Sequence, residues 1–296
     1  MRTKKKIERE REYLFTIEGL LARYENEPTI RDLFVEGQSE VSILSELARK
    51  LCLDNLSVYS IDNVNVPSDL VRDDYGSGNR GRVVALAHAL SQSLASGRAS
   101  VYCLADKDFD EIFETVISCE RLWFTDFSCF EAYLFDSAVI KWIFATYFSV
   151  DLSDAALSDI LGVCRTLFFV RAAKKKLLNA LSWVDPVDQF QLKSGRVLFD
   201  EKNFLLRLLH FQGQKAHADE FTELTRRMEG AAQSDFRNYI HKGDLSSIVC
   251  WFARERGASQ HLCKTEVFNR VLLSQFSLER ISEFALFRNL LSWAAT

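Results

Sequence analysis

The chain has 296 residues, of which 48% are hydrophobic and 26% charged, with only 3 prolines and 12 glycines. At roughly 100–200 residues per domain, this length predicts two domains or one elaborated domain. The low proline and glycine content and the 23 phenylalanines exclude a disordered, collagen-like or linker-rich chain. The formal net charge of −4 is unevenly spread, since residues 1–150 hold 17 basic and 24 acidic side chains and residues 151–296 hold 20 and 17.

The cysteine pattern and the hydropathy profile bear on the compartment. Seven cysteines include no C-x-x-C pair, and most have apolar neighbours, which predicts buried free thiols in a reducing environment. The basic start MRTKKKIERERE is followed by further charge, where a signal peptide would have an apolar segment. No run of about 18 uncharged apolar residues occurs, so we expect a soluble, cytoplasmic protein that does not bind membranes.

The first 136 residues alternate between helical and β-like patterns. A charged amphipathic helix is predicted over residues 4–25, ending near Glu27-Pro28. The predicted strands that follow are 32–35, 56–61, 100–105 and 121–125. Helical spacing appears between and after them, at 40–48, 82–94 and 130–135. Apolar strands that alternate with helices predict an α/β fold with a mostly parallel sheet and flanking helices.

Helical periodicity dominates from about residue 137 onward. The predicted helices are 155–167, 174–183, 204–211, 221–228, 245–254 and 277–293. We therefore expect an N-terminal helix at 1–28, an α/β catalytic domain at 29–136, and a helical C-terminal domain at 137–296.

Acidic side chains follow three of the predicted strands. The carboxyl ends of parallel strands share one edge of a sheet, so these carboxylates can converge there. Converging carboxylates repel one another unless a cation lies between them, and hard oxygen ligands suit Mg²⁺ or Mn²⁺. Such a site points to phosphoryl or phosphodiester chemistry. The candidate ligands are Glu36, Glu40, Asp106, Asp108 and Glu131.

Basic side chains near this edge are candidates for binding a substrate phosphate. The stretch Gly76–Gly81 matches G-x-G-x-x-G, but it lies more than ten residues past its strand, which argues against a dinucleotide site. We expect a glycine loop with Arg80 and Arg82 near the metal edge, and Lys107 between two aspartates. The cluster Arg171, Lys174, Lys175 and Lys176 is open to two interpretations, a solvated helix face or a nucleic-acid contact.

At this point the sequence resembles a known family. The segments Phe34–Glu40 and Asp106–Asp110 resemble the two motifs of the Toprim domain of topoisomerases, bacterial primases and overcoming-lysogenisation-defect (OLD) nucleases. The segment Thr125–Leu134 resembles the stand-alone Toprim nucleases, some of which are phage-defence effectors paired with an ABC-type ATPase, as in the PARIS system. Ile240–Leu245 is similar to a short polar motif of the same subgroup. The resemblance covers roughly residues 30–136.

The resemblance implies a role for each matching residue. It makes Glu36 a catalytic metal ligand or general base and makes Asp106 and Asp108 the catalytic metal-binding pair. Glu40 and Glu131 match later acidic positions of the metal site. Asp110 is a ligand or a helix cap, and we favour the cap. The roles of Lys242 and Asp244 stay open, because their order departs from the family pattern.

The resemblance also implies a function. It describes a Mg²⁺- or Mn²⁺-dependent endonuclease, an antiviral toxin effector that a partner ABC-type ATPase controls and that cleaves tRNA in the PARIS-like case. The chain has no G-x-x-x-x-G-K-[ST] of its own, so ATP-dependent control would come from a partner. A homodimer is compatible with this picture. Two alternatives remain: an OLD-type DNA endonuclease, and a non-catalytic subunit that binds a partner.

Overall fold

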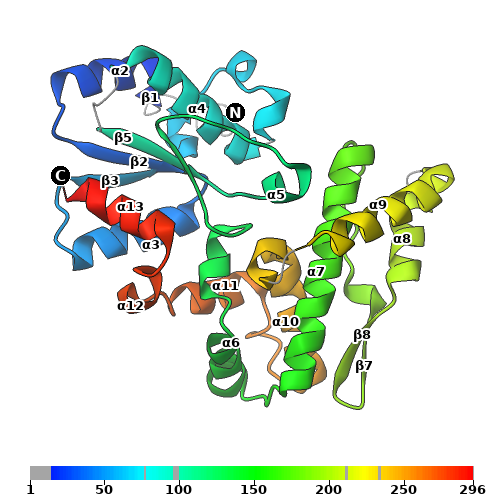
Figure 1. Cartoon of the computed structure of the whole chain (residues 1–296). Helices are drawn as coiled ribbons and strands as arrows, with labels where there is room; N and C mark the ends of the chain where they lie inside the picture. Colours follow the sequence, from blue (N-terminus) through cyan, green and yellow to red (C-terminus); the bar gives the residue numbers. More distant parts are fainter. Residues whose placement is uncertain (1–14, 77, 96–99, 211–212, 233–234, 296) are drawn as a thin grey trace, which may run out of the picture. The chain divides into compact units, whose positions relative to one another are not determined.

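The structure is a computed structural model that describes residues 15–76, 78–95, 100–210, 213–232 and 235–295 (Figure 1). The chain forms two compact units. The first unit consists of Met1–Lys107, Val116–Asp126 and Ser277–Thr296, and the second of Asp108–Thr115 and Phe127–Phe276. These units differ from the predicted ranges 29–136 and 137–296, because residues 277–296 group with the sheet and residues 108–115 and 127–136 group with the second unit.

The first unit is built on a four-stranded parallel sheet with the order β3-β2-β5-β6. Its strands are β2 (Arg31–Val35), β3 (Leu56–Ser60), β5 (Val101–Ala105) and β6 (Leu122–Phe124). All five residues of β2 are buried, as expected for a central strand covered on both faces. The predicted α/β class with a mostly parallel sheet is confirmed.

Helices of the first unit accompany these strands (Figure 1). They are α2 (Ile17–Asn26), α3 (Gln38–Lys50), α4 (Gly78–Ser93), α12 (Leu278–Ile281) and α13 (Ala285–Ala294). Helix α4 presents a row of buried small and branched residues to the core around β5. A short parallel pair, β1 (Phe15–Thr16) with β4 (Val64–Asn65), adds a second small sheet.

The helix predicted over 4–25 is only partly described, since residues 1–14 lie outside the described ranges. Within those ranges the prediction is wrong at Phe15 and Thr16, which form β1. The Thr16 side chain accepts a hydrogen bond from the Gly19 N–H and so caps α2. The helix ends at Asn26, next to the predicted Glu27-Pro28 stop.

The second unit contains one long helix, α7 (Asp154–Leu177), with shorter helices and a β-hairpin. The α-helices besides α7 are α5 (Asp110–Phe113), α6 (Ser137–Ile143), α8 (Glu201–His210), α9 (Ala218–Gly230), α10 (Lys242–Glu255) and α11 (Thr265–Leu273). The hairpin pairs β7 (Phe190–Lys193) with β8 (Arg196–Phe199). No helix of the described residues combines the length and apolar character that a membrane crossing requires.

Three predicted segments of the chain differ from the structure. The helix predicted at 174–183 is wrong beyond Leu177, where α7 ends, and the β7–β8 hairpin was not predicted. The helical stretch 130–135 is a 3-10 helix, η4 (Phe130–Leu134). The predicted helix 277–293 is two helices, because the chain turns between α12 and α13.

Candidate functional site at the carboxyl edge of the sheet

The strand order of the first unit defines where a site is expected. From β2 the chain moves to one neighbour, β3, and then returns to the other side of β2 to form β5. The direction of winding therefore reverses between β2 and β5, and in open α/β sheets ligands bind beyond the strand ends at this point. Glu36 follows β2 directly and Asp106 follows β5 directly.

A hydrogen bond joins these two strand ends. The Asp106 N–H donates to Oε1 of Glu36 over 2.8 Å. The structure thus brings together two of the predicted residues that lie 70 positions apart in the chain. A carboxylate that accepts a backbone N–H is held in a defined orientation at the mouth of the switch point.

Glu40 lies in the first turn of α3 and is only 4% exposed. The helix begins after Gly37, and a Cβ atom at Gly37 would stand 3.2 Å from Oε2 of Glu40. The Glu40 carboxylate therefore folds back over the start of its own helix, where the helix dipole favours negative charge. Gly37 leaves the space that this conformation needs.

The three basic residues predicted to bind substrate contact the protein main chain. Arg80 is 3% exposed, and its guanidinium donates to the carbonyls of Asp106 (3.0 Å) and Tyr75. Lys107 donates from Nζ to the carbonyl of Asp126 over 3.0 Å.

Arg82 is the third of these residues and is similarly engaged. Its guanidinium donates to the carbonyls of Ile61 and Val64 and to Oδ1 of Asp62, over 2.8 to 3.1 Å. It therefore braces the loop between β3 and β4.

The remaining predicted acidic residues belong to the second unit. Asp108 has a left-handed backbone, with φ of 49°, and its N–H donates to the carbonyl of Ser128 over 2.9 Å. Asp110 begins the short helix α5, one position after its N-cap, Phe109. Glu131 is 3% exposed and accepts a hydrogen bond at Oε1 from Lys242 Nζ over 3.2 Å. Its Oε2 has no hydrogen-bond partner among the described residues.

The polar motif at 240–245 is an ion-paired cluster within the second unit. Asp244 is buried and receives two hydrogen bonds from Arg171, of 2.6 and 2.7 Å, while the Arg171 guanidinium lies 3.7 Å from the centre of the Trp183 ring. Burial, together with the charge of Arg171, lowers the pKa of His241 to about 4, so this ring is neutral at pH 7.

The basic side chains at the end of α7 also contact other residues of the second unit. Arg171 is used by Asp244, and Lys174 Nζ donates to the carbonyl of Asn179 over 3.2 Å. The ammonium groups of Lys175 and Lys176 lie 5.2 and 5.9 Å from the centres of the Phe109 and Phe113 rings. These are cation–π distances, so part of the cluster holds the segment 108–115 against α7.

The donor set at the sheet edge is compatible with a hard divalent ion. Glu36 and Asp106 offer carboxylate oxygens there, which Mg²⁺ and Mn²⁺ prefer. In the described ranges, no three acidic, histidine or cysteine side chains form a ready metal centre. Mg²⁺ is often held by one or two carboxylates, with water and substrate phosphates filling the other positions. The chemistry of these two residues therefore fits such an ion.

Sequence reasoning missed two side chains that organise this edge. Nδ2 of Asn79 donates to the carbonyl of Glu36 over 2.8 Å, and Oγ1 of the buried Thr125 accepts the Lys107 N–H over 2.9 Å. The glycine loop before Asn79 and the position of Thr125 at the end of β6 were the available signals. Neither side chain is ionisable, so a search for charged or metal-binding residues does not find them.

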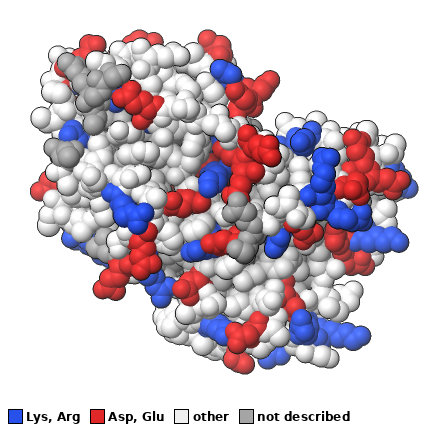
Figure 2. Space-filling model, viewed as in Figure 1, with Lys and Arg blue, Asp and Glu red and all other residues white. Residues whose placement is uncertain are grey.

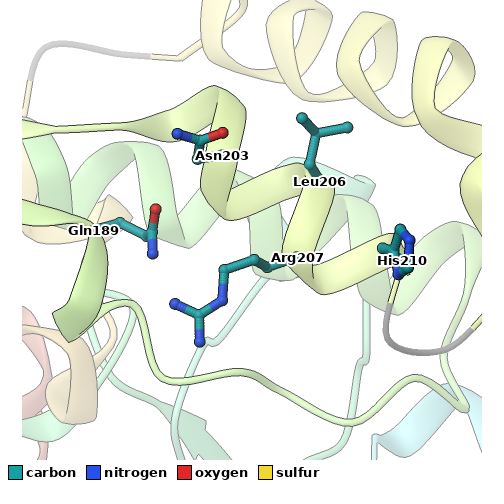
Figure 3. Close-up of a pocket in the computed structure, with 5 residues that line it drawn as sticks. All are labelled: Gln189, Asn203, Leu206, Arg207 and His210. Atoms are coloured by element: carbon teal, nitrogen blue, oxygen red, sulfur yellow. The ribbon is translucent and has the colours of Figure 1, made fainter.

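Two hollows in the second unit lie on α8 and include none of the predicted site residues. One, of about 320 Å³, is lined by Gln189, Asn203, Leu206, Arg207 and His210 (Figure 3). Arg207 in this hollow is ion-paired with Asp188 over 3.1 Å. The other, of about 570 Å³, lies between α8 and α9.

No protein-family model matches this chain, and no curated protein matches its sequence.

Proposed function

We propose that the chain is a cytoplasmic Toprim-type nuclease that uses Mg²⁺ or Mn²⁺ to cleave phosphodiester bonds. Its first unit would carry the Toprim fold, and the residues from 137 to 276 would supply the helical C-terminal region. The observation that carries this proposal is the contact between Glu36 and the Asp106 main chain at the switch point between β2 and β5. This is where an open parallel sheet offers a site, and both residues have the side chains that metal-assisted hydrolysis needs.

Each residue has a defined part in the proposed chemistry. Glu36 and Asp106 would hold the ion within the first unit, with Glu40 as a further ligand, whereas Asp108 and Glu131 of the second unit are assigned to the metal by the family resemblance alone. The ion, when bound, would supply an activated water and offset negative charge on the phosphorus in the transition state. The Asp106 N–H keeps the Glu36 carboxylate aimed at the edge.

For the substrate and the partner, the proposal rests on the resemblance of the two motifs to stand-alone Toprim effectors. We propose an antiviral effector that acts on tRNA and is held inactive by a partner ABC-type ATPase. The OLD-type DNA endonuclease and the non-catalytic partner-binding subunit are the competing outcomes of the test below.

The test compares the full-length chain with the variant Glu36→Gln. Glutamine keeps an Oε1 that accepts the Asp106 N–H but removes the charge, so the fold is retained while the metal ligand is lost. Glu46→Gln is the matched control, because Glu46 is a glutamate of α3, the helix that follows Glu36, and it pairs at the surface with Arg49. Labelled tRNA, duplex DNA and single-stranded DNA are incubated with each protein and Mg²⁺ or Mn²⁺.

We expect tRNA cleavage that falls about 100-fold or more in Glu36→Gln and is unchanged in Glu46→Gln. Cleavage of DNA alone would support the OLD-type alternative. Equal cleavage by all three proteins would identify a contaminant and refute the nuclease proposal. If the wild type is silent, the assay is repeated with any ABC-type ATPase whose gene is found next to that of this chain, and silence with that protein as well would favour the non-catalytic alternative.

A further inference from the structure

Two neighbouring side chains in the first turn of α4 contact both strand ends that carry the carboxylates. Asn79 donates from Nδ2 to the Glu36 carbonyl over 2.8 Å, and Arg80 donates from Nε to the Asp106 carbonyl over 3.0 Å. These contacts join α4 to the chain after β2 and after β5. Together with the bond from the Asp106 N–H to Glu36, they form a closed set of three hydrogen bonds.

The surrounding loop is shaped around the Arg80 side chain. Arg80 also donates to the Tyr75 carbonyl, and its guanidinium lies 5.5 Å from the centre of the Phe124 ring. A Cβ atom at Gly76 would stand 2.7 Å from Nη1 of Arg80, and one at Gly81 would collide with the Gly76 carbonyl. Gly76 also has a φ of 94°, which side-chain-bearing residues rarely adopt. Gly76 therefore makes room for the buried arginine, and Gly81 makes room for the Gly76 main chain.

This geometry separates two roles for Arg80. A substrate contact would require the guanidinium to leave its carbonyl partners and a site that is almost closed to water, and such buried bonds to a charged group are costly to break. A positioning role uses the contacts as they stand. Beyond the last residue of a strand the backbone has no ladder partner, so the direction of the next side chain depends on contacts of this kind.

We propose that Asn79 and Arg80 are positioning residues, which set the direction of the Glu36 and Asp106 carboxylates by fixing their carbonyl groups. This inference rests on the proposed function for its catalytic meaning, but the fixing of the strand ends can be measured without it. Groups that orient metal ligands from behind typically change metal affinity about 10- to 100-fold when they are removed.

The experiment uses the variants Asn79→Ala and Arg80→Met, each with a matched control. Asn26→Ala removes the same kind of bond, from a side-chain amide to a carbonyl, in α2. Arg31→Met removes a buried arginine that donates to three carbonyls at the opposite end of β2. Arg80→Lys is added in case Arg80→Met does not fold.

Two readouts are taken on the full chain. The first is amide hydrogen exchange in peptides that contain the Asp106 N–H, without metal or substrate. We expect exchange at Asp106 to be about 10-fold faster or more in Asn79→Ala and Arg80→Met than in the wild type, and unchanged in both controls. The second is the Mg²⁺ concentration for half-maximal cleavage, which we expect to rise about 10-fold while the rate at saturating Mg²⁺ is retained.

Unchanged exchange at Asp106 in Asn79→Ala and in the folded Arg80 variant would overturn the inference. So would faster exchange combined with an unaltered Mg²⁺ dependence in an active enzyme. If exchange responds as expected but Glu36→Gln cleaves as well as the wild type, the proposed function fails while the positioning of the two strand ends stands.

Discussion

Asp32 is a buried charge at the start of β2, far along the strand from Glu36. It is 1% exposed, accepts a hydrogen bond from the Tyr24 hydroxyl over 3.1 Å, and lies 3.3 Å from Nε of Arg23. Burial raises the pKa of the Asp32 carboxyl above its ordinary value of 3.8, and Arg23 and Tyr24 offset part of this rise. The folded protein therefore holds a proton on Asp32 more tightly than the unfolded chain does.

The sign of the resulting pH dependence follows from this shift. A raised pKa in the folded state contributes stability below the unfolded value near 3.8, and this contribution is lost as the pH rises through the folded pKa. An asparagine side chain at the same position carries no charge at any pH. We therefore expect the free energy of unfolding of Asp32→Asn, relative to the wild type, to increase as the pH is raised from about 4 to about 7.

Urea denaturation of both proteins across this range provides the measurement. Asp54→Asn is the control, because Asp54 is exposed. A difference that shrinks with rising pH would show that Arg23 and Tyr24 more than compensate for burial.

In the second unit, the buried carboxylate of Asp244 differs from Asp32 in that Arg171 pairs with it through two short hydrogen bonds. Removing one partner of a buried pair leaves an uncompensated charge, which typically costs about 3 kcal/mol or more. We expect Asp244→Leu to lower the free energy of unfolding by about 3 kcal/mol. The double variant Arg171→Met with Asp244→Leu should be destabilised less than Asp244→Leu alone. Denaturation of the two single variants and the double variant tests this, and simple additivity would contradict it.

Two glycines, one in α7 and one in the turn of the β7–β8 hairpin, show that the effect of a glycine-to-alanine substitution on stability depends on the element in which it lies. Gly162 lies inside α7, and a Cβ atom there would meet nothing within 4 Å. Gly195 also has open space around it, but it lies in the turn after Lys193 with a φ of 75°, beside Ser194 with a φ of 51°. Two successive residues with positive φ are typical of the tight turns that match the twist of a hairpin.

The same substitution should therefore have opposite effects at the two positions. Gly162→Ala is expected to stabilise the protein by about 0.5–1 kcal/mol, because glycine loses more conformational entropy in a helix. Gly195→Ala is expected to destabilise it by about 1–2 kcal/mol, because alanine resists positive φ. Denaturation midpoints of both variants against the wild type give the comparison. A destabilised Gly162→Ala would contradict the open space found beside Gly162 in α7.

At the scale of the whole chain, the C-terminal helix α13 packs into the core of the first unit. Trp293 on α13 is 7% exposed and lies edge-on to Tyr102 and Trp123, with ring centres 5.1 and 5.5 Å apart. The N–H of Leu286 donates to Asp126, which ties the start of α13 to the chain after β6. Helix α13 is thus part of the first unit, although about 160 residues separate Leu286 from Asp126.

We expect Trp293→Ala to destabilise the first unit by about 3–5 kcal/mol, as for other buried tryptophans. Amide exchange in peptides from β5 and β6 should rise accordingly. Trp142→Ala, at an exposed tryptophan of α6, is the control and should leave these peptides unaltered. Unaltered exchange of the β5 and β6 peptides in Trp293→Ala would show that the Trp293 ring is dispensable to the sheet.

In the folded chain, several basic side chains of residues 151–296 form ion pairs. Residues 151–296 have a charge balance of +3, from 20 basic and 17 acidic side chains, which by itself would favour binding of a phosphate backbone. Several of these cations pair with nearby carboxylates, as Arg196 does with Asp159 and Arg237 with Asp235. Where charged side chains gather on the face shown in Figure 2, basic and acidic ones lie beside one another. A phosphate contact made by a few cations would release few counterions, so its affinity would fall only modestly with salt.

The sequence alone predicted the α/β class and the strands that precede Glu36 and Asp106, because hydrophobic periodicity and strand-end polarity are local properties. It could not predict the contact between these residues, which depends on β5 pairing with β2 across 70 positions. Nor could the sequence assign the structural role of Arg80. An arginine in a glycine loop is typical of a phosphate ligand, and only the structure shows that its guanidinium is buried against two carbonyl groups. The sequence also could not predict that α13 packs against the sheet, because this packing joins residues about 160 positions apart. Long-range packing selects partners by shape and by hydrogen-bond satisfaction, and neither is encoded in the periodicity of a short segment.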